Sequence, residues 1–496
     1  MAEPATGRAQ APGAVDRENP FQGLEYYSEA DAEWFFGRTT DRKVIIAHLR
    51  TARLTVLYAE SGVGKSSLLR AGVAARLREV ATRSIEERGY PKFLPVVFKG
   101  WKDDPVRDLI ATIRAQTRPF AERMRELGIS PPQLGAGRWE PPLDAERFTA
   151  TDGDRFAQPL PDNELASSIE ETTGALGGTL VIMLDQFEEH FGYRVGQEHP
   201  ERLADQLARC INARDIPANF LIAVREDSYG KIGDLFRGRI GNVYRNYLRL
   251  DYLRRESARD AIEGPVRVYN SLHEGQRVQI GPGLIDAVLD EVRRGNLTLA
   301  AGTEERGSSE ASKDEIETPF LQLIMKRLWE YELGNGSQVL RKETLDDDLG
   351  GAQSIVNSHF SRALRDLSPQ EVEMAGAIFA DLVTPSGAKI AHTTSDLADR
   401  TAQSEDAVRA VLEKLDAERI VRAVESAPGS RESRYEIFHD RLAAPILEWR
   451  KQQEKARLER EKRHAEEEAQ QERNQARRFR RLATVVGVLA AGCIIA

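Results

Sequence analysis

The chain has 496 residues, of which 70 are basic and 79 acidic, so its formal charge is −9. This length suggests about three domains of roughly 150 residues each. An acidic chain does not fit a general coat for nucleic acid, because phosphate binding needs a basic surface. Hydrophobic residues make up 41% of the chain, which excludes a wholly disordered protein. The only two cysteines, Cys210 and Cys493, exclude a disulfide framework and a cysteine-based zinc site and suit a reducing cytosol.

The first half of the chain predicts an α/β domain. Residues 1–20 are polar and rich in Ala, Gly and Pro, which indicates a disordered leader, and residues 21–252 alternate strands with helices. Short apolar runs predict four strands, at Leu54–Tyr58, Phe93–Phe98, Thr179–Leu184 and Asn219–Val224. Helices are expected at Lys65–Val80 and Asp104–Arg114, and an insertion or loop at Ser130–Asp162. Such alternation indicates a parallel sheet with helices on both faces.

The second half predicts mostly helices. Strands are expected to stop after Tyr252, and residues 253–350 predict an all-α domain. Its helices are expected at Ser257–Arg267, Gly283–Arg293 and Thr318–Tyr331. Within residues 351–450, a helix–turn–helix with Ser404 as N-cap is followed by two strands around a Gly/Ser/Pro turn, which predicts a winged helix. Residues 451–481 are almost wholly charged, Gln or Ala, and predict a long solvated helix.

The clearest local signal is the segment Ala59-Glu-Ser-Gly-Val-Gly-Lys65-Ser66-Ser67, which lies between a predicted strand and a predicted helix. This is the context that a phosphate-binding P-loop requires. The curled backbone would point successive N–H groups at one anion, and the residues expected around the phosphates are Gly62, Val63, Gly64, Lys65, Ser66 and Ser67. Lys65 would supply a charge for the β- and γ-phosphates, and Ser66 a hydroxyl ligand for Mg²⁺. Ala59 replaces the first Gly of the motif, and a Gly-rich turn with a solvated Lys is the alternative.

A second signal follows the strand that ends at Leu184, where Asp185, Glu188 and Glu189 occur close together. At the C-terminal edge of the sheet, Asp185 would lie beside the P-loop and hold Mg²⁺ through water. Glu188 or Glu189 would orient or deprotonate the attacking water. Alone, such a cluster is more typical of a helix cap, but its position about 120 residues after the P-loop favours a Walker B motif.

Arg225 ends the next predicted strand. Its guanidinium would reach the γ-phosphate and act as an electrostatic sensor, and the alternatives are a helix cap or an ion pair with Asp227. The candidates for catalysis are therefore Lys65, Asp185, Glu188, Glu189 and Arg225.

Taken in this order, the motifs resemble the STAND class of signal-transduction P-loop ATPases, within the AAA+-like division, and in particular the group of novel STAND NTPases. The resemblance covers roughly residues 19–450. Its further marks are Gly23-Leu24, Phe35-Phe36-Gly37-Arg38, Glu263-Gly264-Pro265, the helix PFLQLIMKRLWE and Phe438-His439-Asp440. The Walker motifs alone are generic, whereas their order with FFGR, EGP and FHD is specific.

The resemblance implies further contacts with the nucleotide. Pro265 would pack on adenine, and the Phe36-Gly37-Arg38 segment would line the adenine pocket. His439 would bind the ADP β-phosphate and latch the winged helix over the site, although Phe438 stands where the family motif has Met. From the residues alone, EGP predicts only the end of a helix, FGR a turn at a helix end, and His439 a buried histidine.

The resemblance also implies an ATPase of low turnover that uses ATP, ADP and Mg²⁺ as a switch in signalling or defence. ADP would hold the closed resting state, and ATP an open state that assembles into homo-oligomers. An AAA+-type remodelling ATPase and a winged-helix, nucleotide-sensing transcription regulator are the alternatives. DNA binding is not favoured, because Thr401–Lys414 has few basic residues among Glu405, Asp406 and Glu413.

Residues 482–496 form an uncharged apolar run that follows the basic block Arg477–Arg481. As a helix, these 15 residues would span about 22 Å, short of the roughly 30 Å of a bilayer core. We expect a truncated transmembrane span that tethers a cytoplasmic ATPase domain to the membrane, with the basic block on the cytoplasmic side. An interfacial anchor or a buried helix is the alternative.

Overall fold

The computed structural model describes most of the chain between residues 18 and 463. The described ranges are 18–60, 62–101, 104–129, 163–193, 201–293, 314–365, 367–385, 390–418, 420–424, 434–438, 442–443, 445–459 and 462–463. Outside them lie most of the predicted leader, the predicted insertion at Ser130–Asp162, His439 and the apolar run 482–496.

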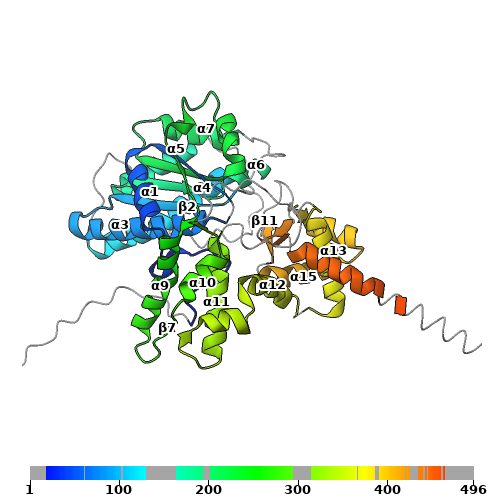
Figure 1. Cartoon of the computed structure of the whole chain (residues 1–496). Helices are drawn as coiled ribbons and strands as arrows, with labels where there is room; N and C mark the ends of the chain where they lie inside the picture. The colour runs from blue at the N-terminus through cyan, green and yellow to red at the C-terminus, as the bar shows by residue number, and fades with distance from the viewer. Residues whose placement is uncertain are drawn as a thin grey trace, which may run out of the picture.

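Five parallel strands form the central sheet, in the order β2-β3-β4-β1-β5 (Figure 1). Their bounds are β1 Leu54–Ala59, β2 Phe93–Phe98, β3 Thr179–Leu184, β4 Ala218–Arg225 and β5 Tyr247–Arg249. The first four strands confirm the predicted ones, and β5 was not predicted. Because β4 lies between β1 and β3, the residues that follow these three strands meet at one edge of the sheet.

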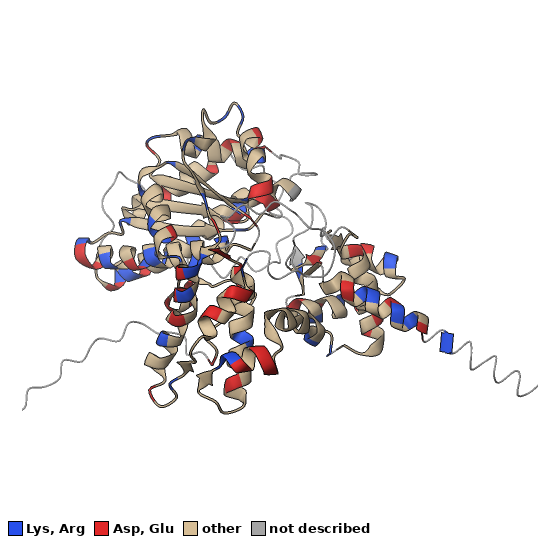
Figure 2. Ribbon diagram, in the orientation of Figure 1, with Lys and Arg blue, Asp and Glu red and all other residues tan. Residues whose placement is uncertain are grey.

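Helices cover both faces of this sheet, as predicted. Residues Val181 and Met183 of β3 pack in one apolar cluster with α1, η2 and the start of α3, while Leu180 and Ile182 pack in a second cluster with α4, α5 and α7. The bounds are η1 Glu29–Trp34, α1 Thr39–Thr51, α2 Lys65–Ser67, η2 Leu68–Ala74, α3 Ala75–Arg88, α4 Pro105–Glu126, α5 Glu164–Leu176, α6 Glu188–Tyr193, α7 Arg202–Asn212 and α8 Tyr229–Leu235. Charged residues are sparse in the sheet and frequent on the surrounding helices (Figure 2).

The next part of the chain is helical, with its own apolar cluster. The bounds are α9 Arg255–Leu272, α10 Leu284–Glu291, α11 Thr318–Gly334, η8 Thr344–Asp348 and α12 Gly351–Ala363. The expectation that strands stop after Tyr252 is wrong, because two pairs of two-residue strands join these helices. They are β6 Leu253–Arg254 with β8 Glu315–Ile316, and β7 Gln279–Ile280 with β9 Val339–Leu340. Strands this short carry no alternating pattern that a sequence could reveal.

The expectation that Glu263-Gly264-Pro265 ends a helix is also wrong, because Pro265 lies inside α9. A proline removes one backbone N–H and normally kinks or breaks a helix. Here α9 buries Gly264 and Pro265 together with Val266 and Tyr269. We infer that the packing of this face outweighs the lost hydrogen bond.

Residues 18–27, which we call the N-terminal strap, pack against α11 of the helical part. The indole Nε1 of Trp329 in α11 donates a hydrogen bond of 2.8 Å to the carbonyl oxygen of Glu18. Phe21 meets Trp329 edge to face, with ring centroids 6.0 Å apart. The hydroxyl of Tyr27 donates to Gln322 Oε1 at 2.7 Å. The strap therefore joins the region before the P-loop to α11.

The last described part confirms the predicted winged helix. Its helices are α13 Pro369–Leu382, α14 Thr394–Thr401 and α15 Glu405–Ala417, and its antiparallel sheet has the order β10 His392–Thr393, β12 Arg434–Ile437 and β11 Val421–Val424. The hydroxyl of Ser404 accepts a hydrogen bond from the Ala407 N–H, so it caps α15 as predicted. Residues 445–459 continue as a helix that becomes largely exposed after residue 450.

Candidate functional site

Three strand ends bring the predicted site residues together. The P-loop follows β1, Asp185 follows β3, and Arg225 is the last residue of β4 between them. Lys65 interacts electrostatically with Glu188, Asp185 and Arg225. The structure therefore gathers the predicted catalytic side chains Lys65, Asp185, Glu188 and Arg225 at one edge of the sheet.

The described part of the P-loop has the backbone of an anion-binding loop. Gly62 and Gly64 have φ angles of 80° and 98°, which only glycine adopts without strain, and α2 begins directly afterwards at Lys65. Ser61 lies outside the described residues. The loop thus leads into the N-terminal end of a helix, where backbone N–H groups favour a phosphate.

Lys65 is folded back onto its own loop. Its ammonium donates to the carbonyl oxygens of Ala59 and Glu60, at 3.0 and 3.1 Å, and its side chain is only 8% exposed. Burial lowers the pKa of Lys65, while the carboxylates of Glu188 and Asp185 oppose that shift. The lysine is a buried cation whose two hydrogen-bond partners are neutral carbonyl groups, so a phosphate would be a better partner.

Asp185 presents a buried carboxylate with unused hydrogen-bonding capacity. The residue is 1% exposed, and neither carboxylate oxygen accepts a hydrogen bond from the described residues. Arg70 Nε lies 3.9 Å from one of these oxygens, which is within range of an ion pair but too long for a hydrogen bond. The backbone is firmly held, because Asp185 N donates to Phe98 O at 2.8 Å and Trp101 Nε1 donates to Asp185 O at 2.9 Å.

This donor set fits Mg²⁺, which prefers carboxylate and hydroxyl oxygens and keeps several waters. The orphaned oxygens of Asp185 supply the carboxylate, and Ser66 at the first turn after the P-loop supplies the hydroxyl. No cluster of three or more metal-ligating His, Cys, Asp or Glu side chains occurs among the described residues. Mg²⁺ is usually held by one or two carboxylates, with waters and substrate phosphates as its other ligands.

Glu188, the first of the two glutamates after Asp185, is held by a hydrogen bond from the end of β4. Glu188 Oε2 accepts a hydrogen bond of 3.1 Å from the Arg225 N–H. Burial raises the pKa of the Glu188 carboxyl, and the charge of Lys65 opposes this shift. A raised pKa suits a general base. Glu188 therefore has an environment that suits the activation of water.

Arg225 combines features of both predicted alternatives. Its guanidinium forms an ion pair with Asp227 at 2.8 Å, which was the structural alternative to a sensor. Its positive charge also lowers the pKa of Lys65, so the guanidinium lies close to the P-loop, where a γ-phosphate sensor is expected. The side chains of this ion pair are partly exposed, at 28% for Arg225 and 58% for Asp227. Exposed ion pairs contribute little stability, so Arg225 can exchange Asp227 for another partner at a small cost in free energy.

Arg38 binds the backbone of the P-loop. Its side chain is 6% exposed, and its guanidinium donates to the carbonyl oxygens of Val63 and Asp251, both at 2.8 Å. Its third partner is Asp41, at 2.9 Å. In this structure the Arg38 side chain therefore holds the P-loop in place through the backbone carbonyl group of Val63.

Phe36 and Gly37 contact α9, and this contact brings the FGR and EGP motifs together. A Cβ atom on Gly264 would lie only 2.2 Å from the Phe36 ring, and one on Gly37 would lie 2.5 Å from the Ser257 carbonyl oxygen. Gly37 has a φ of 85°, and its N–H donates to Asp260 Oδ2 at 3.1 Å. Pro265, next to this contact, is buried within α9.

Several residues of the site were not predicted. Tyr27 N donates to Ser67 Oγ at 3.1 Å, so the predicted phosphate ligand Ser67 also anchors the N-terminal strap. Tyr252 donates to Glu60 Oε2 at 2.9 Å, and Arg70 and Trp101 contact Asp185 as described above. None of these residues belongs to a motif, so no local pattern in the sequence could identify them.

The wing of the winged helix is in electrostatic range of the Walker B acids. Arg422 in β11 donates to Glu436 Oε1 through Nε at 2.8 Å and through Nη2 at 2.5 Å. Burial lowers the pKa of Arg422, but Glu436, Glu189 and Glu188 raise it, and the net direction is upward. His439 lies outside the described residues, while Phe438 packs against the winged-helix core and its N–H donates to Ile420 O at 2.8 Å.

A cavity of about 650 Å³ lies elsewhere on the sheet domain, lined by α1, α3 and the start of β2. None of the predicted site residues lines it. The nucleotide site at the P-loop is therefore recognised from its backbone conformation and its charged side chains, and not from the volume of a cavity. Within the described ranges, no helix is long and apolar enough to cross a membrane.

Comparison with known proteins identifies the chain at the level of a family. The family model described as Novel STAND NTPase 1 matches residues 20–482. No curated protein sequence matches the chain. Among solved structures, a Walker-type ATPase of Pyrococcus abyssi is 17% identical, with 86% of this chain and 99% of that chain covered and a TM-score of 0.38. The ORC1 protein of Aeropyrum pernix, in complex with DNA, is 15% identical, with 84% and 93% covered and a TM-score of 0.38.

Proposed function

Because the chain belongs to the novel STAND NTPase family, we propose that it is an ATP-binding molecular switch with slow hydrolysis. ADP would hold a closed resting state, and ATP would favour an open state that forms homo-oligomers in signalling or defence. The observation that carries this proposal is the position of Arg422 in the wing, within electrostatic range of Glu188, which itself acts on Lys65 of the P-loop.

Binding of the nucleotide begins with the P-loop. Lys65 would exchange the carbonyl oxygens of Ala59 and Glu60 for β- and γ-phosphate oxygens, which form stronger, charge-assisted hydrogen bonds. The N–H groups of the loop and of the first turn of α2 would surround the same phosphates. Phe36 and Pro265 would contribute apolar contacts to adenine.

Ser66 and Asp185 are the residues that would hold Mg²⁺. When bound, the ion neutralises charge on the β- and γ-phosphate oxygens. Glu188 would accept a proton from the attacking water, because burial raises its pKa. Arg225 would leave Asp227 and bind the γ-phosphate, so that its position reports whether ATP or ADP is present.

The switch requires a ligand that distinguishes two states. Moving from mostly closed to mostly open takes about 5 kcal/mol of differential binding. Several charge-assisted contacts to one γ-phosphate supply energy of this order. In the closed state the winged helix would remain over the site through His439, and the wing would keep Arg422 near the Walker B acids.

The first test is the nucleotide that the full-length chain carries after purification. The protein is denatured, and the released nucleotide is identified by chromatography. About one ADP per chain is expected, and Lys65→Ala should release none. An empty wild-type site would contradict a locked resting state and favour a freely exchanging motor.

The latch is tested by His439→Ala, with His392→Ala in the same winged helix as the matched control. Loss of the latch should release ADP and shift the protein from monomer to oligomer in the presence of ATP, measured by light scattering after size exclusion. A His439→Ala variant that stays monomeric and ADP-bound contradicts the latch.

A DNA-reading role is not supported by the helix that would enter a groove. Both basic residues of α15 are engaged within the molecule: Lys414 forms an ion pair with Glu371 at 2.8 Å, and Arg409 one with Glu405 at 4.0 Å. The helix also carries Glu405, Asp406, Glu413 and Asp416, so it is acidic overall, whereas phosphate binding needs a basic surface. Sequence-specific binding lost on changing Arg409 and Lys414 together would overturn this view.

We further propose that residues 482–496 contact a membrane and tether the ATPase on its cytoplasmic side. The apolar composition of this run and the preceding basic block support the proposal. The full-length chain should float with anionic liposomes, and Leu489→Asp should abolish flotation. Equal flotation of both proteins contradicts the tether.

A further inference from the structure

A second cavity, which we call the junction cavity, lies where three parts of the chain meet. Its volume is about 410 Å³, within the range of roughly 300–1,000 Å³ that holds small molecules. The N-terminal strap contributes residues 22–25, α11 and α12 contribute most of the wall, and Ala417 and Glu418 come from the end of α15. None of its lining residues belongs to the P-loop or to the Walker B segment.

The junction cavity is lined by cations that form no close ion pair with a described residue, although Glu330 and Glu418 act on Arg362 from a greater distance. Lys326 of α11 and Arg362 of α12 line it together with Arg365, and none of the three forms an ion pair with a described residue. Most other arginines of the described chain do form such pairs, including Arg327 in the same wall, which pairs with Glu330 at 3.8 Å. Three cations without an ion pair to a described residue therefore line this one cavity.

Two polar atoms in this wall are buried without a hydrogen-bond partner among the described residues, namely His359 Nε2 and Arg362 Nε. Burial lowers the pKa of Arg362 and the positive charge of Arg327 lowers it further, while Glu330 and Glu418 oppose this shift without cancelling it. Withdrawing a cation and a hydrogen-bonding nitrogen from water without partners is costly. An anion in the cavity would remove both costs at once.

The chemistry of the wall indicates which anion fits. Arginine forks, a lysine and an imidazole are the groups that bind phosphate oxygens. Glu25, Glu330 and Glu418 also line the cavity, and carboxylates accept hydrogen bonds from hydroxyl or amino groups. A ligand with a phosphate at one end and hydroxyl or amino groups at the other would match both sets.

We propose that the junction cavity is a second ligand site, separate from the P-loop, that binds a small phosphorylated molecule through Lys326, His359, Arg362 and Arg365. Such a ligand bridges α11, α12 and the end of α15, so it links the helical part to the winged helix. It also contacts the N-terminal strap, whose Tyr27 N–H is hydrogen-bonded to Ser67 Oγ after the P-loop.

The test uses the full-length chain with Lys65→Ala, which weakens phosphate binding at the P-loop. Ribose 5-phosphate is the probe, with inorganic pyrophosphate as a second probe that lacks the sugar hydroxyls, and binding is measured by calorimetry. At least one of them should bind, and adding Arg362→Gln should weaken that binding about tenfold or more, as expected for the loss of a charge-assisted contact. Arg362→Lys should retain part of the affinity, and Arg409→Gln on the surface of α15 should retain all of it.

Lys326→Gln provides an independent variant, because Lys326 lines the same wall from a different helix. Its effect should match that of Arg362→Gln in direction, and circular dichroism and thermal melting establish that both variants are folded. Failure of both probes to bind overturns the proposal. Binding that is unchanged in folded Arg362→Gln and Lys326→Gln variants also overturns it.

Discussion

At the scale of single residues, the buried carboxylate of Asp185 lowers the stability of the free protein but is suited to binding a ligand. Its carboxylate is buried and its oxygens accept no hydrogen bond from the described residues; Arg70 forms an ion pair with it at 3.9 Å, and Lys65 acts on it only through its charge. Such an arrangement costs stability in the absence of a ligand and is typical of a site that a ligand completes.

Asp185→Asn should therefore stabilise the nucleotide-free protein while it abolishes Mg²⁺-dependent nucleotide binding. The expected gain is on the order of 1 kcal/mol, because a neutral amide is less costly to bury than a charge. Denaturant unfolding in the presence of a chelator measures the gain, and binding of a fluorescent ADP measures the loss. Lower stability of the variant would show that Asp185 is already satisfied in the free protein.

The contact between Phe36 and Gly264 makes a second prediction. A Cβ atom at position 264 would lie 2.2 Å from the aromatic ring, so the ring or the helix must move. Gly264→Ala should destabilise the protein by about 1–2 kcal/mol, although alanine favours a helix. In a double-mutant cycle Phe36→Ala should relieve this effect, and additive costs of the two substitutions would contradict the contact.

The residues of the site divide into those with a local signal and those without one. Lys65 and Asp185 were predictable because each follows an apolar strand within a motif. The support that Arg38 gives to Val63 was not predictable, because the hydrogen bond joins residues 25 positions apart. Pro265 was misjudged, since the rule that proline ends a helix ignores the face that α9 buries.

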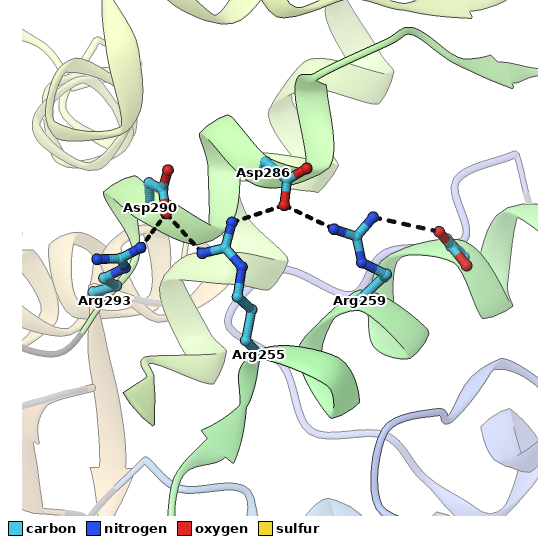
Figure 3. Close-up of polar contacts among 6 residues, drawn as sticks. Arg255, Arg259, Asp286, Asp290 and Arg293 are labelled. Atoms are coloured by element: carbon cyan, nitrogen blue, oxygen red, sulfur yellow. Dashed lines mark hydrogen bonds and ion pairs between the residues drawn. The ribbon is translucent and has the colours of Figure 1, made fainter. Parts of the chain in front are cut away.

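At the scale of elements, α9 and α10 are joined by a ladder of ion pairs on their exposed sides (Figure 3). Arg255 lies between Asp286 and Asp290, at 2.7 and 2.6 Å, and Asp286 also binds Arg259 at 2.7 Å. Hydrogen bonds from Arg255 lower the pKa of both aspartates. One carboxylate thus serves two arginines from successive turns of α9.

Asp286→Asn should lower the melting temperature slightly at low salt, because two ion pairs are lost together. The difference should shrink in about 1 M NaCl, where the Debye length falls to roughly 3 Å. Calorimetric scans at both salt concentrations measure it, with Asp234→Asn as the control for a single exposed pair. A difference that does not depend on salt would mean that helix packing, and not charge, causes it.

The elements also show where sequence patterns reach their limit. The strands β2 and β3 are six-residue apolar runs, and they were predicted with their correct bounds. The strand β5 has three residues, two of them exposed, and it forms only by pairing with β1, almost 200 positions earlier. Pairing of this kind depends on the tertiary structure, which a local pattern cannot contain.

At the scale of the whole molecule, the junction cavity makes stability depend on pH. Burial, together with the positive charges of Arg362 and Lys326, lowers the pKa of His359 from 6.5 to about 4. Between these two values the unfolded chain binds a proton that the folded chain does not. The contribution of a neutral His359 is therefore fully present above about pH 6.5 and is lost as the pH falls towards about 4.

The loss amounts to at most roughly 3 kcal/mol, from 1.36 kcal/mol per pKa unit. His359→Leu should flatten the profile of unfolding free energy between pH 4 and 6.5 relative to the wild type. Denaturant titrations at several pH values measure the difference, with His48→Gln in α1 as the control. Parallel profiles of the wild type and His359→Leu would contradict the buried, neutral histidine.

The general architecture of the molecule was predictable, because each part has its own periodic pattern, from the parallel sheet to the winged helix. The junction cavity was not, because its wall combines residues 22–25, α11, α12 and the end of α15, which are far apart in the sequence. The same holds for the proximity of Arg422 to Glu188 and Glu189, which only the folded chain brings about.

The N-terminal strap has a consequence for the synthesis of the protein. Glu18 and Trp329, joined by a hydrogen bond, are separated by 311 positions. At about 5–20 residues per second, a ribosome needs roughly 15–60 s to reach α11 after the strap has been made. During this interval Phe21 lacks its aromatic partner Trp329, although the sheet domain is made before α11. A chaperone that recognises exposed aromatic segments would act in that interval, which ends when α11 is made.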